Sequence, residues 1–521
     1  MGDVTELGTD VLIVGAGPSG LMLAVCLARL GVDAVIVDGK SGPTRESRAL
    51  GVQARSMELY DQLGLIDRVL AESYPARNAV PGFRDRPFGS IALRGLGTRV
   101  TPYPEVTVLE QSRNEAILVD ALAELGRVVL WEHRLTSLEE ASVRADAAGR
   151  RHPVTATLDS PGGPVTVRAR YCVGADGAHS IVRGLRGIPF EGVTNVHTFY
   201  VVDAHGVTGL VDDAVNIRFN ADDFLLAFPM GPGGHTRLLG IVRDRDLAAD
   251  GTLPESLVHE RVERGFGVRY RDSSWFTTYR LHHRLAARFR DGPFFLAGDA
   301  AHIHSPVGAQ GMNTGLQEAH NLACAFADVL VGGMPDERLD RYEQERRPVA
   351  ARLVGTTDRA FATITSDSRW ARFMRGRVVP VIGPIVARLV SRVVGGERVF
   401  GYISQTRIHY RMTRPSGRDR GRRRDHRRDA VVGRRLPWTG GNYDVLRSMT
   451  WQVHGYGVLP AEVERIASEL GVEAHAFGRD PNRRLRPDRV YLVRRDGFVA
   501  AEASAHAVPG GPRAFREQLA G

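Results

Sequence analysis

Short apolar runs that stop at glycine or aspartate set the pattern of the N-terminal part of the chain. Four such runs occupy residues 11–14, 34–37, 171–173 and 294–297, and they end at or just before Gly15, Asp38, Gly174 and Gly298. Continuous apolar runs of this length are typical of parallel strands that are buried on both faces. Residues 19–30 follow the first run with a helix-forming sequence, and Gly31 stands where a helix C-cap is expected. The pattern predicts an α/β unit built on a parallel sheet.

Alternating apolar and polar positions replace these runs in the middle of the chain. The alternation predicts strands of an antiparallel sheet at residues 197–202, 215–219, 224–228 and 237–242. Residues 356–412 have a largely helical pattern. The last part of the chain returns to an α/β pattern, with a helix at 461–470, strands near 474–477 and 490–493, and a hairpin turn at 494–497.

The residues after the first apolar run fit the spacing G-x-G-x-x-G. In such a motif the first glycine permits a tight turn, the second lets the backbone approach a pyrophosphate, and the third lets helix and strand pack closely. The N-terminal amides of the following helix favour phosphate, and an acid about 20 residues later binds ribose. The candidate cofactor residues are accordingly Gly15, Gly17, Pro18, Ser19, Gly20 and Asp38.

Two more motifs follow apolar runs further along the chain. Residues 174–183 contain Asp176-Gly177, which predicts a turn before a helix, although an ordinary turn with a helix-capping acid would show the same pattern. Residues 298–313 place Asp299 after a strand and lead through a glycine-containing segment into another helix. In this order and at these spacings, the three motifs resemble those of the FAD-dependent aromatic hydroxylases, the single-component flavoprotein monooxygenases.

The resemblance implies a role for each candidate residue at an FAD site. Asp299 is expected to hydrogen-bond the ribityl chain, and Pro306 is expected to lie beside the isoalloxazine. The helix that begins between Gly308 and Asn313 is expected to point its amides at the flavin pyrimidine edge, where they favour negative charge. The cofactor-binding residues implied are Gly15, Gly17, Pro18, Ser19, Gly20, Asp38, Arg48, Gln111, Asp176, Gly177, Asp299, Pro306, Gly311, Met312 and Asn313, and those implied for catalysis are Pro306, Gly308 and Arg48.

The resemblance also implies an α/β fold with a Rossmann-like FAD-binding domain, an antiparallel-sheet substrate domain and a C-terminal thioredoxin-like domain. The expected FAD-binding domain is discontinuous and comprises residues 1–75, 105–185 and 285–355. Residues 76–104 and 186–284 are assigned to the substrate domain, 356–412 to a helical segment, 413–430 to a basic linker and 431–521 to the thioredoxin-like domain. That last domain contains no cysteine, so packing or dimerisation is its expected role.

Composition argues against several other classes of protein. The formal net charge is +9, but residues 414–435 supply most of it with ten arginines and three aspartates, and no aromatic residue interleaves them for base stacking. That segment is interpreted as a solvated linker and not as a nucleic-acid site. No apolar run approaches the length of a membrane span, and the three cysteines form no C-x-x-C metal or dithiol motif. We expect a cytoplasmic protein without nucleic-acid, membrane or metal partners.

The function implied by the resemblance is NAD(P)H-dependent monooxygenation. NADPH or NADH would reduce FAD, O2 would form the flavin C4a-hydroperoxide, and one oxygen atom would pass to a polycyclic, polyketide-like aromatic substrate. Baeyer–Villiger oxidation or inactivation of an aromatic antibiotic would use the same scaffold, and a non-catalytic FAD-binding protein is a third alternative. The sequence leaves open these alternatives, the choice of nucleotide, and whether the protein is a monomer or a homodimer.

Overall fold

The computed structural model describes most of the chain. The described residues are 5–44, 49–93, 95, 97–140, 152–231, 233–243, 247–248, 252–304, 310–365, 368–393, 400–401, 404–410, 412, 431–506 and 511–521. The predicted basic linker, residues 413–430, and the candidate residues Arg48, Pro306 and Gly308 lie outside this part.

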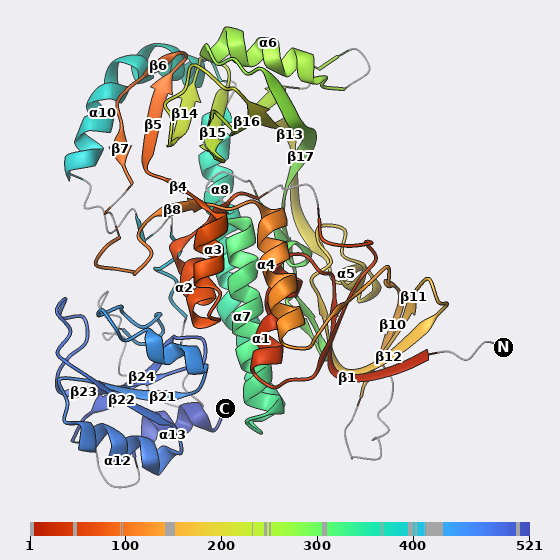
Figure 1. The fold of residues 1–521 in the computed structure, drawn as a ribbon, viewed down its shortest axis with the longest axis vertical. Coiled ribbons are helices and arrows are strands. Elements are labelled where there is room, and N and C mark those ends of the chain that lie inside the picture. The colour runs from red at the N-terminus through yellow and green to blue at the C-terminus, as the bar shows by residue number, and fades with distance from the viewer. Residues whose placement is uncertain are drawn as a thin grey trace.

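The first unit is built on an eight-stranded sheet (Figure 1). Its parallel strands are β1 (Thr5–Val14), β2 (Ala34–Asp38), β9 (Val129–Trp131), β12 (Val165–Gly174) and β19 (Phe294–Leu296). All four apolar runs of the sequence overlap these strands, so the predicted parallel sheet is confirmed. An antiparallel edge, β10 (Arg134–Glu140) and β11 (Val154–Asp159), extends the sheet beyond β12, and the short β18 (Arg290–Asp291) pairs with β19.

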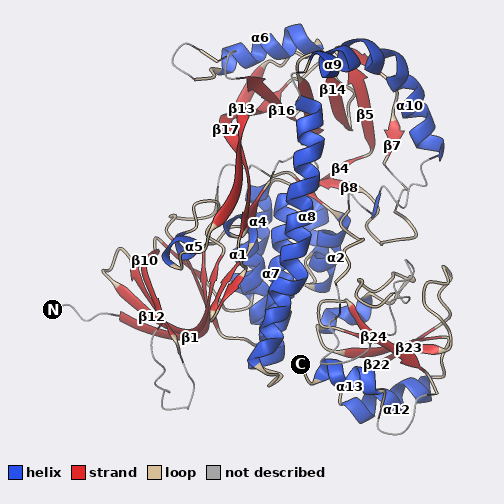
Figure 2. Cartoon of the chain, turned by 180° about the vertical axis from the view of Figure 1, so that it is seen from behind, coloured by secondary structure: helices blue, strands red, loops and turns tan. Residues whose placement is uncertain are grey.

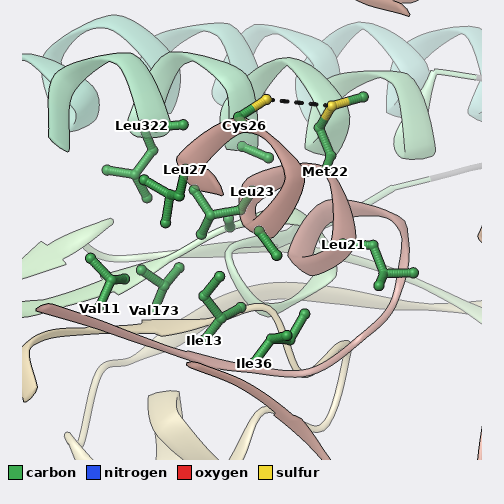
Figure 3. Close-up of a cluster of buried hydrophobic side chains, with 14 of the residues drawn as sticks. Val11, Ile13, Leu21, Met22, Leu23, Cys26, Leu27, Ile36, Val173 and Leu322 are labelled. Atoms are coloured by element: carbon green, nitrogen blue, oxygen red, sulfur yellow. Dashed lines mark hydrogen bonds between the residues drawn. The ribbon is translucent and has the colours of Figure 1, made fainter. Parts of the chain in front are cut away.

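Three long helices build the core around this sheet: α1 (Pro18–Arg29), α4 (Gln111–Glu124) and α7 (Gly311–Leu330). Figure 3 shows Leu23 and Leu27 of α1 above Val11 and Val173 of the sheet, with Leu322 of α7 close by. Each such fully buried side chain contributes about 1.5–3 kcal/mol to stability. α7 is buried at every residue from 313 to 328, so it lies inside the protein and not on its surface.

A second, nine-stranded sheet lies beyond the helices and contains the strands predicted from alternation. Its order is β20-β17-β13-β16-β15-β14-β5-β6, with β7 also pairing with β5. The strands are β5 (Asn78–Phe83), β6 (Arg86–Pro87), β7 (Ile91–Ala92), β13 (Phe190–His205), β14 (Ala214–Phe219), β15 (Phe224–Pro229), β16 (Thr236–Arg243), β17 (Asp272–Ala286) and β20 (His302–Ile303). The four predicted strands are antiparallel as expected, whereas β5 pairs with β14 in parallel, so the whole sheet is mixed.

Several long elements run from one unit into the next. Figure 2 shows β13 and β17 extending from the second sheet toward the central unit. The domain limits expected at 75, 284 and 355 consequently fall inside β4 (Tyr74–Ala76), β17 and α8 (Asp340–Thr365). The limits are placed from the positions of the motifs, and in the structure these three elements continue across them.

The C-terminal part forms a separate four-stranded sheet of order β22-β21-β23-β24. It consists of β21 (Gln452–Tyr456), β22 (Glu473–Phe477), β23 (Arg489–Val493) and β24 (Val499–Ser504), with helices α12 (Pro460–Leu470) and α13 (Arg513–Leu519). The predicted helix, both predicted strands and the hairpin turn are present. Val463, Ile466 and Phe515 of the helices pack against Val490 and Leu492, so both helices cover the same face of the sheet.

The remaining elements are short or peripheral. A small sheet of β3 (Gly51–Val52), β8 (Val106–Val108) and β4 lies beside α2 (Ala54–Gln62) and α3 (Ile66–Glu72). The described residues also form the helices α5 (Ile181–Leu185), α6 (Glu255–Phe266), α9 (Arg369–Phe373) and α10 (Val379–Val393). Helical turns are η2 (Gly298–Ala300), η3 (Asp336–Leu339), η4 (Met374–Val378) and η5 (Asp444–Ser448). Within the described ranges, no helix has both the length and the hydropathy needed to span a bilayer.

Candidate active site

A cavity of about 910 Å³ opens at the carboxyl ends of β1, β2 and β12. Ligands bind at this edge of open α/β sheets, because loops and helix N-termini converge there. The other side of the cavity is formed by β15, β16 and β17, so both large sheets border one space. Its volume lies in the range of ligand pockets, about 300–1,000 Å³.

The turn between β1 and α1 is shaped for the close approach of an anionic group. Gly15 has φ +106°, and a Cβ there would collide with the carbonyl of Ala175. Gly20 packs against the Gly15 carbonyl, which fixes α1 close to the strand. A Cβ at Gly17, in contrast, would meet nothing within 4 Å, and α1 begins there with neither a side-chain cap nor an acid in its first turn. The first amides of α1 therefore remain available to a phosphate.

Asp38 and Gln111 lie on the same wall of the cavity. The Asp38 carboxylate accepts the N–H of Ala16 at 2.7 Å and the N–H of Lys40 at 2.9 Å, so it also stabilises the glycine turn. Gln111, at the start of α4, donates to Glu115 Oε1 at 2.9 Å. Glu115 is fully buried, and its carboxylate therefore orients the Gln111 amide at the cavity wall.

Asp176 caps the short helix α5. Its carboxylate accepts the N–H of Ile181 at 2.6 Å and the N–H of Val182 at 3.1 Å. Burial raises the pKa of Asp176, although these hydrogen bonds act in the opposite direction. The Asp176 carboxylate therefore has the helix-capping role that the sequence left open. Asp176 and Gly177 also form part of the cavity wall.

Asp299 lies on the cavity wall in the turn η2, and that turn is held by Glu318 of α7. Gly298 donates its N–H to Glu318 Oε2 at 2.9 Å, and His302 Nε2 lies 2.8 Å from Glu318 Oε1. Burial disfavours both charges, but the partners outweigh it: the pKa of His302 is raised by Glu318, and the pKa of Glu318 is lowered by His302. The two form a buried ion pair behind Asp299. Sequence reasoning missed Glu318, because no spacing marks a helical glutamate as the partner of this turn.

The first residues of α7 reach the cavity. Gly311 and Met312 lie on its wall, and the helix has neither a side-chain cap nor an acid in its first turn. Asn313 is fully buried; its amide accepts the N–H of Gln53 at 2.8 Å and donates to the Gly51 carbonyl at 2.7 Å. Asn313 therefore ties β3 and the residue after it to α7.

The second sheet contributes apolar and cationic side chains to the same cavity. Phe228, Leu239 and Tyr279 are its apolar and aromatic lining residues from β15, β16 and β17. Arg237 is 1% exposed and binds both carboxylate oxygens of Asp203 at 2.5 Å. Further titratable side chains on this part of the wall are Arg280, His282 and His304. The alternation predicted these strands but did not show which of their faces borders the cavity.

The structure gathers most of the predicted cofactor residues on one wall. Those that line the cavity are Gly15, Gly17, Pro18, Ser19, Asp38, Gln111, Asp176, Gly177, Asp299, Gly311 and Met312. Gly20 and Asn313 support this wall through their contacts with neighbouring backbone. The three residues predicted for catalysis, Arg48, Pro306 and Gly308, lie outside the described residues.

This donor set fits a flavin dinucleotide. Two helix N-termini without side-chain caps, those of α1 and α7, suit negative charge on a diphosphate and on a reduced ring. Asp38 and Asp299 offer carboxylate acceptors to the hydroxyl groups of a ribose and a ribityl chain. The residues on the wall therefore match the parts of FAD by chemistry as well as by motif.

Comparisons with known proteins agree with this chemistry. A family model described as FAD binding domain matches residues 8–357. The chain is 32% identical over 513 residues to a rifampicin monooxygenase of Rhodococcus hoagii, covering 96% of each chain. It is 34% identical over 417 residues to a 6-methylpretetramide 4-monooxygenase of Streptomyces rimosus, covering 77% of this chain and 70% of the relative.

The fold is also shared with solved structures. The anhydrotetracycline hydroxylase OxyS from Streptomyces rimosus superposes with a TM-score of 0.76 at 27% identity, covering 99% of this chain and 100% of the other. Since the family model spans more than half of the sequence and the curated relatives match along most of their length, the chain belongs to the FAD-dependent aromatic hydroxylases and is an NAD(P)H-consuming flavoprotein monooxygenase.

Proposed function

We propose that the protein hydroxylates a polycyclic, polyketide-like aromatic compound that binds against the second sheet. The observation that carries the proposal is that Asp299 lines the same cavity as Phe228, Leu239 and Tyr279. Aromatic and aliphatic side chains favour a flat apolar ligand. The names of the relatives, which refer to 6-methylpretetramide and rifampicin, support a large multi-ring substrate.

The residues of the cavity wall would bind and orient the cofactor. FAD, once reduced by NADPH or NADH, supplies the activation of O2. The amides at the start of α1 would hold the diphosphate, Asp38 the ribose and Asp299 the ribityl chain. The Gly311 and Met312 amides at the start of α7 would stabilise negative charge on the ring.

The second sheet would position the substrate and exclude water. Phe228, Leu239 and Tyr279 would cover the apolar faces of the substrate and keep water from them. Arg237 and Asp203 neutralise each other through paired hydrogen bonds, so this arginine adds little net charge to the cavity wall.

A second candidate is the oxidative inactivation of an aromatic antibiotic. The relative named for rifampicin aligns over 96% of both chains, whereas the 6-methylpretetramide enzyme covers 77% of this chain. Hydroxylation and inactivation differ in the product, so mass and bond connectivity of the product from each substrate distinguish them. Baeyer–Villiger oxidation would also add one oxygen atom but would insert it into the carbon skeleton.

We also propose that the C-terminal unit is a thioredoxin-like domain that acts by packing. Its four-stranded mixed sheet with both helices on one face supports this assignment, and the absence of cysteine from residues 431–521 rules out dithiol chemistry there. We further propose the domain limits expected from the motifs. We also propose that the protein is a monomer or a homodimer.

Oxidation of NADH and NADPH by the purified holoenzyme tests the function. With a panel of polycyclic phenols and quinones, we expect one compound to increase nucleotide oxidation many-fold and to gain one oxygen atom. Bound FAD that neither nucleotide reduces, with every compound tested, would refute the proposal.

Asp299→Ala tests the site. Loss of the carboxylate removes the expected ribityl contact, so the purified variant should lose most of its yellow colour. Asp159→Ala, which removes an exposed acid at the end of β11, is the matched control and should keep its flavin. An Asp299→Ala protein with full flavin content would show the assignment of this residue to be wrong.

A further inference from the structure

The segment 369–393 carries an exposed apolar face. It comprises α9, η4 and α10, and Figure 1 shows α10 at the edge of the molecule beside β5 and β7. We call this segment the α9–α10 ridge. Its exposed large apolar side chains, with exposures of 47–69%, are Trp370, Phe373, Val381, Ile382, Ile385 and Val386.

The opposite face of the ridge is packed on the protein. A Cβ at Gly383 would collide with the ring of Phe88, and Ala387 is buried. Arg375 is also buried and donates from Nε to the Ala221 carbonyl at 3.1 Å. The ridge is therefore docked on the second sheet and on the loops that join its strands, while the apolar side chains named above remain exposed.

The ridge is strongly basic. Residues 369–393 contain six arginines and no aspartate or glutamate. Arg375 points into the protein, and Arg372 lies 3.6 Å from Asp222, an exposed ion pair that solvent screens. Arg369 and Arg377 are exposed. Among the described side chains, exposed arginines therefore occur in the same segment as the exposed apolar side chains.

This combination of charge and exposure selects one kind of partner. Proteins without a partner seldom expose so many large apolar side chains together. Two copies facing each other through this ridge would bring like-charged arginines together, which is unfavourable. Helices with Trp, Phe and aliphatic side chains beside arginines bind in the plane of an anionic lipid surface, which satisfies both properties.

We propose that the α9–α10 ridge docks the protein peripherally on an anionic lipid surface. The apolar side chains enter the boundary between headgroups and acyl chains, and the arginines bind lipid phosphates. This revises the expectation of no membrane partner, which considered spanning segments alone. The proposal does not depend on the monooxygenase function, because binding is measured without substrate.

Sedimentation of the holoenzyme with lipid vesicles tests the proposal. We expect binding to vesicles of phosphatidylcholine with about one-third phosphatidylglycerol, and much weaker binding to phosphatidylcholine alone, since each arginine near an anionic surface is worth about fivefold in affinity. Binding to the anionic vesicles should also weaken as the ionic strength rises from about 0.05 M to about 0.5 M.

Two variants separate docking through the ridge from non-specific attraction. Ile382→Glu with Ile385→Glu should lower the partition coefficient by about a hundredfold, since each aliphatic side chain withdrawn from lipid costs about tenfold. Leu459→Glu changes a side chain that is 69% exposed in the C-terminal unit and should bind as the unmodified protein does. Unchanged flavin absorbance in both variants shows that they are folded.

Three results would overturn the proposal. The first is no binding to anionic vesicles at low ionic strength. The second is equal binding by the unmodified protein and the Ile382→Glu, Ile385→Glu variant. The third is concentration-dependent self-association that only this variant loses, which would make the ridge an interface between two copies of the chain.

Discussion

Replacing Arg494 by methionine would remove the countercharge of two buried carboxylates between α8 and the C-terminal unit. Arg494 is 2% exposed. It donates to Glu345 Oε1 at 2.5 Å and Oε2 at 2.9 Å, and to Asp496 Oδ2 at 2.7 Å. Burial works against the guanidinium charge, but Asp496 and Glu345 outweigh it and raise the pKa of Arg494 well above its usual value. Methionine keeps much of the side-chain volume and removes the charge.

The expected loss is large because both carboxylates remain buried. Glu345 is 6% exposed and Asp496 is 1% exposed, so water would replace little of the lost interaction. Asn321 still donates to both carboxylates, at 2.9 Å and 3.1 Å, but an amide does not neutralise their charge. Removing one partner of a buried ion pair costs about 3–5 kcal/mol in free energy of unfolding.

Urea unfolding of the holoenzyme, followed by flavin release and by far-ultraviolet circular dichroism, measures this loss. The control is Arg513→Met, which removes an exposed ion pair with Glu517 and should cost about 0–1 kcal/mol. The direction in which this loss changes with pH follows from the pKa shift of Asp496. Arg494 lowers the pKa of Asp496, so this stabilisation is present above the unfolded pKa of the acid and is lost as the pH falls.

The difference between the unmodified protein and Arg494→Met should therefore shrink at acid pH, where the orphaned carboxylates take up protons. A loss below about 1 kcal/mol at neutral pH would refute the reasoning. A large loss that does not change with pH would also contradict it, since that result would assign the effect to packing of the arginine stem and not to charge.

Two further predictions concern buried titratable groups. Burial lowers the pKa of His320 and of His454 to about 3, and the nearby charges of Arg55 and His475 act in the same direction. The free energy of unfolding should therefore fall by about 1.4 kcal/mol per pH unit for each histidine as the pH drops below about 6.5. His454→Gln should remove one histidine's share of that slope in urea titrations, and an unchanged slope would contradict it. Burial raises the pKa of Cys26 to about 12 and raises the pKa values of Cys172 and Cys324 as well, so Ellman's reagent should detect no thiol in the native protein and three after denaturation. A thiol that reacts in the native protein would show local opening near that cysteine.

The sequence predicts the elements well where one local rule determines them. The runs at 11–14 and 34–37 are parallel strands because a doubly covered strand needs apolar residues at every position. Gly15 and Gly20 are glycines because a neighbouring carbonyl leaves no room for a Cβ. Alternation likewise predicted the strands β13 to β16, since one face of each strand packs differently from the other.

The remaining features depend on contacts between distant segments, which no local pattern encodes. Glu318 pairs with His302 and holds Gly298 because α7 crosses behind the turn. The parallel pairing of β5 with β14 joins segments separated by more than a hundred residues, so alternation alone predicted an antiparallel sheet. Phe228 and Tyr279 reach the cavity only because the second sheet folds over the first unit.

Helix α7 contacts the cavity at its start and the C-terminal unit near its end. Gly311 and Met312 at its start line the cavity, whereas Asp328 near its end accepts the indole N–H of Trp451 at 2.8 Å and pairs with Arg495 at 2.8 Å. Every residue between 313 and 328 is buried, and a close-packed helix does not shift at one end without repacking along its length. The C-terminal contacts therefore help to fix the position of the helix end that faces the cofactor. None of the described residues of the C-terminal unit lines the cavity, so its contacts reach the cavity through α7 alone among these elements.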